Sequence, residues 1–415
     1  MFVLIFVAGV LLAHFYLWHR LVRQTTGPGR LRKSLTWGLA GLLAVLVTTF
    51  AGTRMGLESW VAWPGYIWLA VMFYLVVILA VLEIPRAVVA AFLRRAGRRE
   101  RAPEAAPEPV AVLAGTAGLE EAASVEAAFV GAGAASGGMS RRLFLGRATA
   151  AVAGVSALGT VGYGMSSALG DPVIERVKVA LPKLDSRLSG LRFAVVSDIH
   201  LGPLTGIGHT ERIVRMINGL EADVVAIVGD LVDGSVAQLG ALAKPLKSLE
   251  SRYGAFFVTG NHEYFAPEGP GEWVEELGEL GVRSLRNERV EIRHQGAVLD
   301  LAGVNDVGGT SVGDGPDFTK ALGGRDAGQS TVLLAHQPIQ VSEAARHGVD
   351  LQLSGHTHGG QIAPFNLVVG LQQPVVSGLA TIDGVQVYVS RGAGFWGPPV
   401  RVGAPPEITM LELHS

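Results

Sequence analysis

Histidine, aspartate and asparagine recur in five short motifs between residues 197 and 360, namely "SDIH", "GDLVD", "GNHE", "AHQP" and "GHTHGG". The residues with metal-binding side chains in these motifs are Asp198, His200, Asp230, Asp233, Asn261, His262, Glu263, His336, His356 and His358. Imidazole and oxygen donors without thiolates suit Mn, Fe or Zn. Since the chain has no cysteine, a thiolate zinc site and a cysteine nucleophile are excluded. The motifs therefore predict a metal site built from histidine and oxygen ligands.

Each motif follows a short apolar run of the kind that forms a buried strand: "LRFAVVSD", "DVVAIVGD", "GAFFVTGN", "STVLLAH" and "DLQLSGH". Between the first two runs, apolar residues at Ile213, Met216, Ile217 and Leu220 have helical spacing. This alternation predicts an α/β fold with helices covering a sheet. Ligands bind beyond the carboxyl ends of the strands in such sheets, so we expect the five motifs to meet in one site.

Single motifs of this type are weak evidence, and His336 alone would more often be a helix cap or a core histidine. The ordered repetition after five apolar runs favours the functional interpretation. Asp233 and Glu263 are expected to orient ligands or loops, although a turn or cap role is an open alternative for Asp233. Arg391, in "VSRGAG", would contact a substrate phosphate or form a surface ion pair, and the residues alone leave both open.

The ordered motifs resemble those of the calcineurin-like metallophosphoesterase superfamily, over residues 191–413. The fuller wording "GNHEYF", "GHTHGGQ" and "SRGAGFWGPPVR" is similar to its bacterial membrane-associated branch, whose members often carry N-terminal helices or a twin-arginine signal. The resemblance implies an α/β fold, a four-layer αββα metallophosphoesterase sandwich, here preceded by an N-terminal transmembrane helical region.

The resemblance also implies a role for each motif residue. It makes Asp198, His200 and His358 ligands of one metal ion, Asn261, His336 and His356 ligands of a second, and Asp230 the bridge between them. His262 would donate a proton to the leaving group or stabilise charge in the transition state. Two divalent ions (Mn, Fe or Zn, with Mn favoured) would hydrolyse a phosphomonoester, phosphodiester or pyrophosphate bond by attack of metal-bound hydroxide.

The N-terminal region, residues 1–93, contains three apolar runs at 1–21, 34–52 and 63–82, each close to the length of a transmembrane helix. A signal peptide is the alternative for the first run, but that run lacks a positively charged start. Five basic residues, from Arg20 to Lys33, lie at the end of the first run and in the loop after it, and one basic residue lies between the second and third runs. The positive-inside rule therefore places the first loop in the cytoplasm and the N-terminus outside.

Residues 94–139 are rich in Ala, Pro, Glu and Gly and predict a flexible cytoplasmic linker. Residues 140–170 begin with paired arginines and continue with a weakly hydrophobic Ala/Gly run, which resembles a twin-arginine export signal. An ordinary fourth transmembrane helix is the alternative. Either segment would export residues 171–415, the expected phosphoesterase domain, and "SSA" at 166–168 leaves cleavage open.

Charge is distributed unevenly, with 15 Lys and Arg against 8 Asp and Glu in residues 1–170, and 19 against 28 in residues 171–415. The C-terminal part therefore carries a formal charge of -9, which disfavours a nucleic-acid partner. We expect a multi-pass protein of the bacterial cytoplasmic membrane whose catalytic domain is extracytoplasmic. Its partners would be the lipid bilayer, the twin-arginine export machinery and a phosphate ester, for which a lipid-linked or cell-envelope compound is the favoured source. A nucleotide or polynucleotide phosphodiesterase, and a non-catalytic metal-binding sensory module, are the alternatives.

Overall fold

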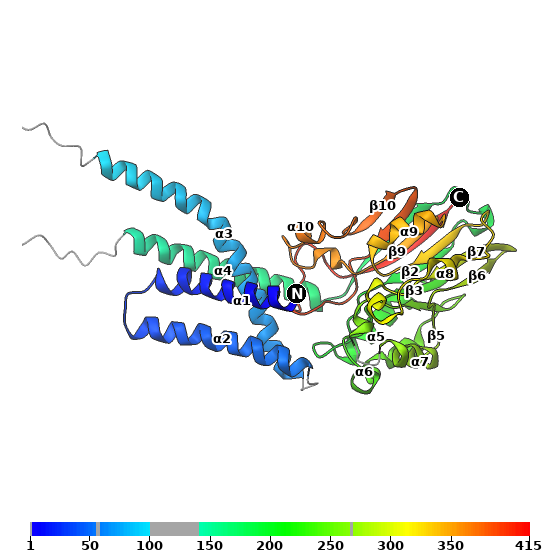
Figure 1. Ribbon diagram of the computed structural model, residues 1–415, viewed down its shortest axis with the longest axis horizontal. Helices are drawn as coiled ribbons and strands as arrows, with labels where there is room; N and C mark the ends of the chain where they lie inside the picture. Colours follow the sequence, from blue (N-terminus) through cyan, green and yellow to red (C-terminus); the bar gives the residue numbers. More distant parts are fainter. Residues whose placement is uncertain (1, 55–58, 100–140, 266–268) are drawn as a thin grey trace, which may run out of the picture. The chain divides into compact units, whose positions relative to one another are not determined.

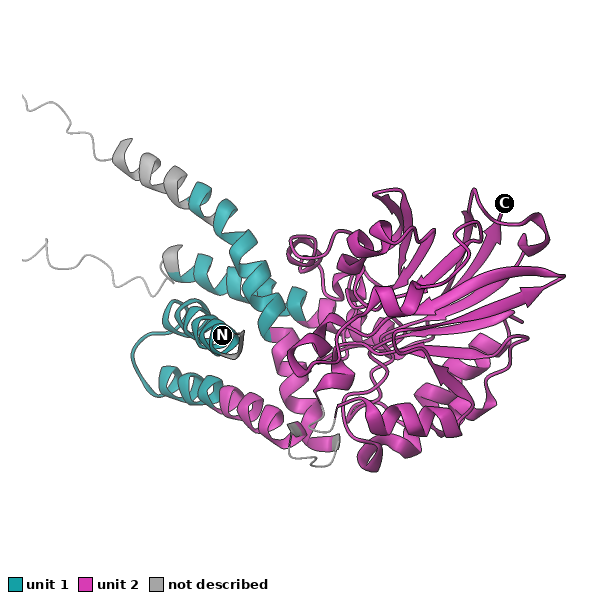
Figure 2. Ribbon diagram, turned by 45° about the vertical axis from the view of Figure 1, so that its right-hand side comes forward, with its two compact units in different colours: residues 1–40, 72–157 teal, residues 41–71, 158–415 magenta. Residues whose placement is uncertain are grey.

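The computed structural model describes residues 2–54, 59–99, 141–265 and 269–415 of the chain. Within these ranges lie two compact units, residues 1–40 with 72–157, and residues 41–71 with 158–415 (Figure 2). The boundaries between the units fall inside helices. Most of the predicted linker lies outside the described residues, except that its first part continues the helix that ends at Arg99.

Long apolar helices occupy the N-terminal part of the chain. They are α1 (Phe2–Leu17), which continues as the π-helix Trp18–Arg23, then α2 (Arg30–Arg54), α3 (Ala62–Arg99) and α4 (Arg141–Leu169), with a short 3-10 turn Ser59–Val61 before α3. Among the described residues, four helices are long and apolar enough to cross a membrane. Their apolar windows are Leu4–Arg23, Arg30–Thr53, Ala62–Val89 and Leu143–Leu169. The three apolar runs of the sequence thus form long helices, and the twin-arginine-like segment forms a fourth.

Two six-stranded sheets lie in the second unit (Figure 1). The first has the order β1 (Val173–Ala180), β12 (Glu407–His414), β2 (Arg192–Val196), β3 (Val224–Val228), β4 (Ala255–Val258) and β5 (Val282–Ser284). The second has the order β10 (Gly378–Ile382), β11 (Val385–Val389), β9 (Leu351–Ser354), β8 (Thr331–Leu334), β7 (Ala297–Gly303) and β6 (Glu288–His294). Strands β2 to β5 are mutually parallel, as are β7, β8 and β9.

The sheets pack face to face and helices cover their outer faces. In β2, Phe193 and Val195 enter the core between the sheets, whereas Ala194 and Val196 enter a second core beneath the helices α5 (Ile207–Asn218), α6 (Val236–Ala243) and α7 (Gly271–Glu279). A third core lies between the other sheet and the helices α8 (Phe318–Leu322) and α9 (Val341–Arg346). Both faces of β2 are buried, which explains why its sequence is continuously apolar. The predicted four-layer αββα sandwich is confirmed.

Candidate functional site

The five motifs meet where parallel strands of both sheets end. Strands β2, β3 and β4 of one sheet are followed by "SDIH", "GDLVD" and "GNHE", and strands β8 and β9 of the other by "AHQP" and "GHTHGG". Five residues of these loops have left-handed backbone with positive φ: Asp198 (51°), His200 (49°), Asp230 (50°), His356 (72°) and His358 (51°). Such strained conformations of non-glycine residues cluster at functional sites. The structure therefore forms one site from segments that are far apart in sequence.

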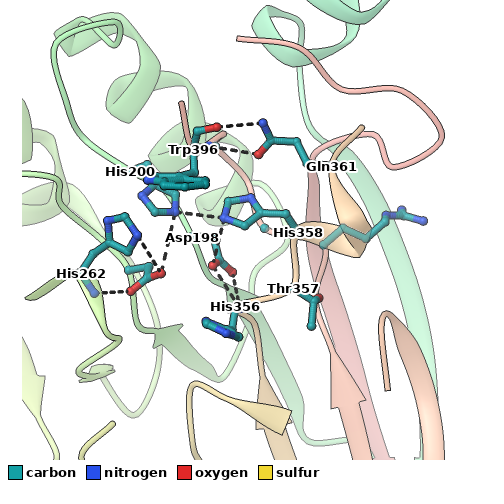
Figure 3. A network of polar contacts seen from close by, with 12 residues as sticks. Asp198, His200, His262, His356, Thr357, His358, Gln361 and Trp396 are labelled. Atoms are coloured by element: carbon teal, nitrogen blue, oxygen red, sulfur yellow. Dashed lines mark hydrogen bonds and ion pairs between the residues drawn. The ribbon is translucent and has the colours of Figure 1, made fainter. Parts of the chain in front are cut away.

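One group of candidate metal ligands consists of Asp198, His200 and His358, all of them buried (Figure 3). The Nε2 atoms of His200 and His358 are 3.0 Å apart, and His358 Nε2 lies 3.4 Å from Asp198 Oδ1. Burial, followed by the nearby charge of Arg401, holds the pKa of His358 well below its usual range. A neutral imidazole can offer a lone pair, so the three side chains suit a single divalent cation.

A second group contains Asp230, His336 and His356, with Asn261 beside it on the neighbouring loop. His336 Nε2 is 3.2 Å from Asp230 Oδ2, and His336 Nδ1 lies 2.8 Å from the carbonyl oxygen of Val228. When Nδ1 donates its proton to that carbonyl, the lone pair of Nε2 points into the site, an arrangement typical of metal-binding histidines. Burial lowers the pKa of His356 to about 3, which keeps this imidazole neutral.

The side-chain oxygen of Asn261 supports a cation in this second group. Asn261 Oδ1 is buried and has no hydrogen-bond partner among the described residues. An unpaired buried amide oxygen costs free energy unless a donor or a cation satisfies it. The donor set of the second group, with its carboxylate, amide oxygen and neutral imidazoles, therefore fits a divalent metal ion.

Asp230 lies between the two groups. Its Oδ2 atom is 3.2 Å from His336 Nε2 and 3.9 Å from His200 Nε2, which belongs to the other group. Burial alone would raise the pKa of Asp230, but the imidazoles of His336 and His262 outweigh burial and hold it well below its usual range. A single ionised carboxylate thus faces both groups.

Asp233 connects a ligand histidine to His262. Its Oδ1 atom lies 2.8 Å from His200 Nδ1 and 2.7 Å from His262 Nδ1. The Nε2 atom of His262 remains directed toward the site, 3.9 Å from Asp230 Oδ2. Burial would lower the pKa of His262, but the carboxylates of Asp230 and Asp233 outweigh it and raise this pKa to about 9. His262 is therefore a cation with an available proton.

Glu263 holds the loops after β3 and β4 together. Its carboxylate accepts hydrogen bonds from the backbone N–H groups of Gly260 (2.6 Å), Asp230 (3.1 Å), Leu231 (2.8 Å) and Val232 (3.3 Å). Both carboxylate oxygens are used in this way. Glu263 therefore fixes the backbone of the loop that carries Asp230.

Arg391 is occupied by two carboxylates. Its guanidinium lies 2.5 Å from Glu175 Oε1 and 2.6 Å from Glu407 Oε2. These contacts are those of an ion pair, so of the two alternatives for Arg391 the geometry favours this one over a substrate phosphate.

Arg401 is a residue that the sequence reasoning missed. It is fully buried and donates to the carbonyl oxygens of His358 (2.8 Å), Arg391 (2.8 Å) and Gly394 (3.1 Å), while its other nitrogen lies 3.0 Å from His358 Nδ1. It therefore ties the "GHTHGG" loop to the loop "SRGAGFWGPPVR". The one sequence signal for Arg401 was its position at the end of "SRGAGFWGPPVR", since a loop rich in Pro and Gly has no apolar periodicity.

Two further polar residues join the site's surroundings. Asp306 is buried beyond the end of β7, where its carboxylate accepts from Gln337 Nε2 at 3.0 Å beside the "AHQP" motif. Gln361 holds the backbone of Trp396 through two hydrogen bonds. The backbone N–H of Trp396 donates to Gln361 Oε1 at 3.0 Å, and Gln361 Nε2 donates to the backbone carbonyl oxygen of Trp396 at 2.9 Å (Figure 3). In the sequence, Asp306 ends the triplet "VND" directly after an apolar run, and this position was the signal that could have identified it.

A small pocket opens beside the first ligand group. Its lining includes His200, Asp233, Phe395 and Gly397, together with Tyr66 from the first turns of α3. The empty volume is about 250 Å³. A side chain of an apolar helix thus lines the same pocket as a ligand histidine.

Two face-to-face sheets whose strand ends converge on paired histidine and carboxylate groups define a metallophosphoesterase. Residues 191–360 match the family model described as calcineurin-like phosphoesterase. The chain belongs to this family.

Relatives include membrane proteins from animals and a bacterial protein. The chain is 39% identical to a transmembrane protein with metallophosphoesterase domain from Bos taurus, over 72% of this chain and 69% of that protein. It is 38% identical to a protein of the same description from Danio rerio, over 61% of this chain and 60% of that protein. It is 41% identical to an uncharacterized metallophosphoesterase from Helicobacter pylori, over 62% of this chain and 68% of that protein. The match thus spans less than two thirds of the Danio rerio relative's length.

Proposed function

We propose that this membrane protein is a dinuclear-metal phosphoesterase. The observation that carries the proposal is the position of Asp230 Oδ2 between two separate ligand groups. Asp198, His200 and His358 would hold one ion, and Asn261, His336 and His356 the other, with Asp230 shared. Two divalent cations bound there would supply Lewis-acid activation of a water and neutralise charge on the phosphoryl oxygens. Mn, Fe and Zn all suit these donors, and Mn is the ion we would load first.

His262 would act on the leaving group. Its Nε2 faces the site, and Asp233 fixes the ring through Nδ1 at 2.7 Å. Since its pKa is raised to about 9, the ring carries a proton at neutral pH. It can donate that proton from Nε2 to the departing oxygen, or stabilise charge there. Asp233 and Glu263 keep His262 and the Asp230 loop in position.

A phosphate ester carried by a lipid or by another cell-envelope component is the substrate class we favour, whether monoester, diester or pyrophosphate. Strand β1 begins at Val173, shortly after α4 ends at Leu169, so the domain cannot be far from the membrane. Tyr66 of α3, an apolar helix, also lines the pocket beside His200. A nucleotide or polynucleotide diester is the second candidate, disfavoured by the charge of -9. A sensory module without activity would not need His262 in addition to every ligand.

For location, we propose the bacterial cytoplasmic membrane, with the domain outside and a twin-arginine signal at the start of α4. The backbone N–H of Arg401 donates to the carbonyl oxygen of Gly164 at 2.9 Å. Ala168, the last residue of the "SSA" triplet at 166–168, lies in α4 and is buried. These contacts favour retention of α4 after export.

The test uses the full chain in detergent, loaded with Mn, with an aryl phosphodiester and a panel of lipid, nucleotide and aryl phosphate esters. Asp230→Asn should lose metal and activity, and His262→Ala should lose activity while it retains metal. His414→Ala, which changes a histidine outside the motifs, serves as the matched control. Equal activity of wild type, Asp230→Asn and His262→Ala would contradict the proposal.

A further inference from the structure

The segment that follows the last ligand histidine is unusual for the surface of a soluble domain. From residue 359 to residue 382, 24 consecutive residues include no Asp, Glu, Lys, Arg or His. The short helix α10 (Asn366–Val369) lies within it. Four apolar side chains of this region, Phe365, Leu367, Val368 and Leu371, are exposed, Leu367 to 70% and Leu371 to 87%. We call these four residues the α10 patch.

The inner side of this segment is fixed to the domain. Thr357 Oγ1 donates to the carbonyl oxygen of Val376 at 2.7 Å, and the N–H of Ile339 donates to Gln373 Oε1 at 3.0 Å. The backbone of Asn366 lies so close to Gly360 that a Cβ on Gly360 would be 2.4 Å from the Asn366 Cα. The segment is thus held in place while its apolar side chains face outward. An exposed apolar group of this kind marks a surface that another phase or molecule covers.

The last part of α4, from residue 158, belongs to the same compact unit as the α10 patch, and two sets of contacts connect them. Arg401 N donates to the carbonyl oxygen of Gly164 in α4 at 2.9 Å, and a Cβ at Gly164 would lie 2.5 Å from Val400 Cγ1. The next residue, Val402, donates to the carbonyl oxygen of Gln361 at 2.8 Å and accepts from Ala363 N at 2.9 Å. Phe365 follows two residues later. The patch is therefore continuous with the contact between α4 and the domain.

We propose that the α10 patch inserts into the interfacial layer of the bilayer that α4 crosses, so that the domain touches the membrane with a second element. A charge-free segment with exposed Phe, Leu and Val suits the boundary between headgroups and acyl chains. We favour the lipid bilayer as the occupant because Gly164 of α4 contacts the 400–402 loop, which in turn contacts the segment that carries the patch. This membrane contact does not depend on metal binding or hydrolysis.

The experiment exploits the absence of cysteine from the chain. Leu367→Cys and Leu371→Cys are each labelled with an environment-sensitive fluorophore in the full-length protein. The protein is then placed in nanodiscs of phosphatidylethanolamine and phosphatidylglycerol, with or without a lipid that carries a quencher at the top of its acyl chain. Glu250→Cys is the control, since Glu250 is exposed at the amino end of β4, opposite to the ligand end.

We expect a blue-shifted emission and loss of fluorescence with the quencher lipid at positions 367 and 371, and neither at 250. Equal, water-like emission at all three positions would overturn the proposal. Disulfide-linked dimers of the unlabelled Leu371→Cys protein, without lipid quenching of the labelled protein, would also overturn it, because they would identify a second copy of the chain as the occupant. Since Leu367 and Leu371 are exposed, an unchanged thermal unfolding midpoint should accompany each labelled variant.

Discussion

At the scale of single residues, Asp233 has an unusual position because one of its oxygens serves two histidines with different roles. Its Oδ1 is within 2.8 Å of His200 Nδ1 and 2.7 Å of His262 Nδ1. In the proposed mechanism, the first contact orients a metal-binding nitrogen of His200, and the second orients His262, the proposed proton donor, and favours its charged form. The same carboxylate can therefore couple the state of the metal site to the protonation of His262.

Asp233→Asn tests this coupling. Asparagine can still accept a hydrogen bond, but it lacks the charge that helps to raise the pKa of His262 to about 9. A proton donor is active below its pKa, so activity is lost as the pH rises through that pKa. The variant should therefore lose activity at lower pH than the wild type, together with a fall in activity of about 10- to 100-fold. The pH dependence of kcat with the Mn-loaded protein measures this, and an unmoved basic limb would contradict the role of Asp233.

Arg401 makes a prediction about stability. Lysine at this position cannot reach the carbonyl oxygens of His358, Arg391 and Gly394 together. Buried carbonyl oxygens left without donors cost about 1–3 kcal/mol each, so Arg401→Lys should lower the free energy of unfolding by at least about 2 kcal/mol. The matched control is Arg346→Lys on the surface of α9, where a change within about 0.5 kcal/mol is expected. Thermal unfolding in detergent compares the two, and equal midpoints would show that Arg401 is dispensable.

At the scale of elements, the strands before the five motifs were predictable because each is buried and a polar motif follows it. Strands β2, β3 and β4 are apolar on both faces, whereas β9 carries Gln352 and Ser354 on one face. Strand β7, which precedes Asp306, was harder to predict from the sequence. Asp300 interrupts its apolar run and pairs with Arg289 at 2.5 Å. Asp306 was missed for that reason. Arg401 lies in a loop, and the α10 patch lies in a four-residue helix and the turns beside it, segments too short for any periodicity to link a residue to the place it occupies. Long-range contacts decide those positions, and a single sequence does not record them.

The close approach of the β3 and β4 loops gives a prediction for Gly260. A Cβ on Gly260 would lie 2.2 Å from Asp230 Oδ1 and 2.4 Å from the Asp230 backbone nitrogen. Gly260→Ala must therefore displace the carboxylate that faces both ligand groups, at a cost of about 1–3 kcal/mol in stability and with loss of bound metal. Gly278→Ala, in α7 with nothing within 4 Å of its Cβ, should instead stabilise the protein by up to about 1 kcal/mol. Metal content and thermal unfolding of both variants test this contrast, which equal metal content in the two would refute.

At the scale of the whole molecule, the basic residues and the catalytic domain are expected on opposite sides of the membrane. The start of α4 belongs with the first basic loop, because Arg147 Nε donates to the carbonyl oxygen of Thr25 at 3.1 Å within one compact unit. The end of α4 leads into β1. If α4 spans the membrane, the loop that contains Thr25 lies on one side and the domain on the other, as the positive-inside rule predicts.

Export of the domain can be read with a reporter fused after Ser415 that is active only outside the cytoplasm. We expect activity there, and none from a fusion at Gly27 in the basic loop. The change of Arg141 and Arg142 to lysine separates the two ways in which α4 could be exported. Lysine keeps the positive charge, so the charge rule alone would leave the domain outside. A twin-arginine signal is read by a receptor that requires the arginine pair, so the double variant should instead retain the reporter inside. Full export of the double variant would identify α4 as an ordinary span, and a cytoplasmic readout for the unchanged chain would overturn the orientation itself.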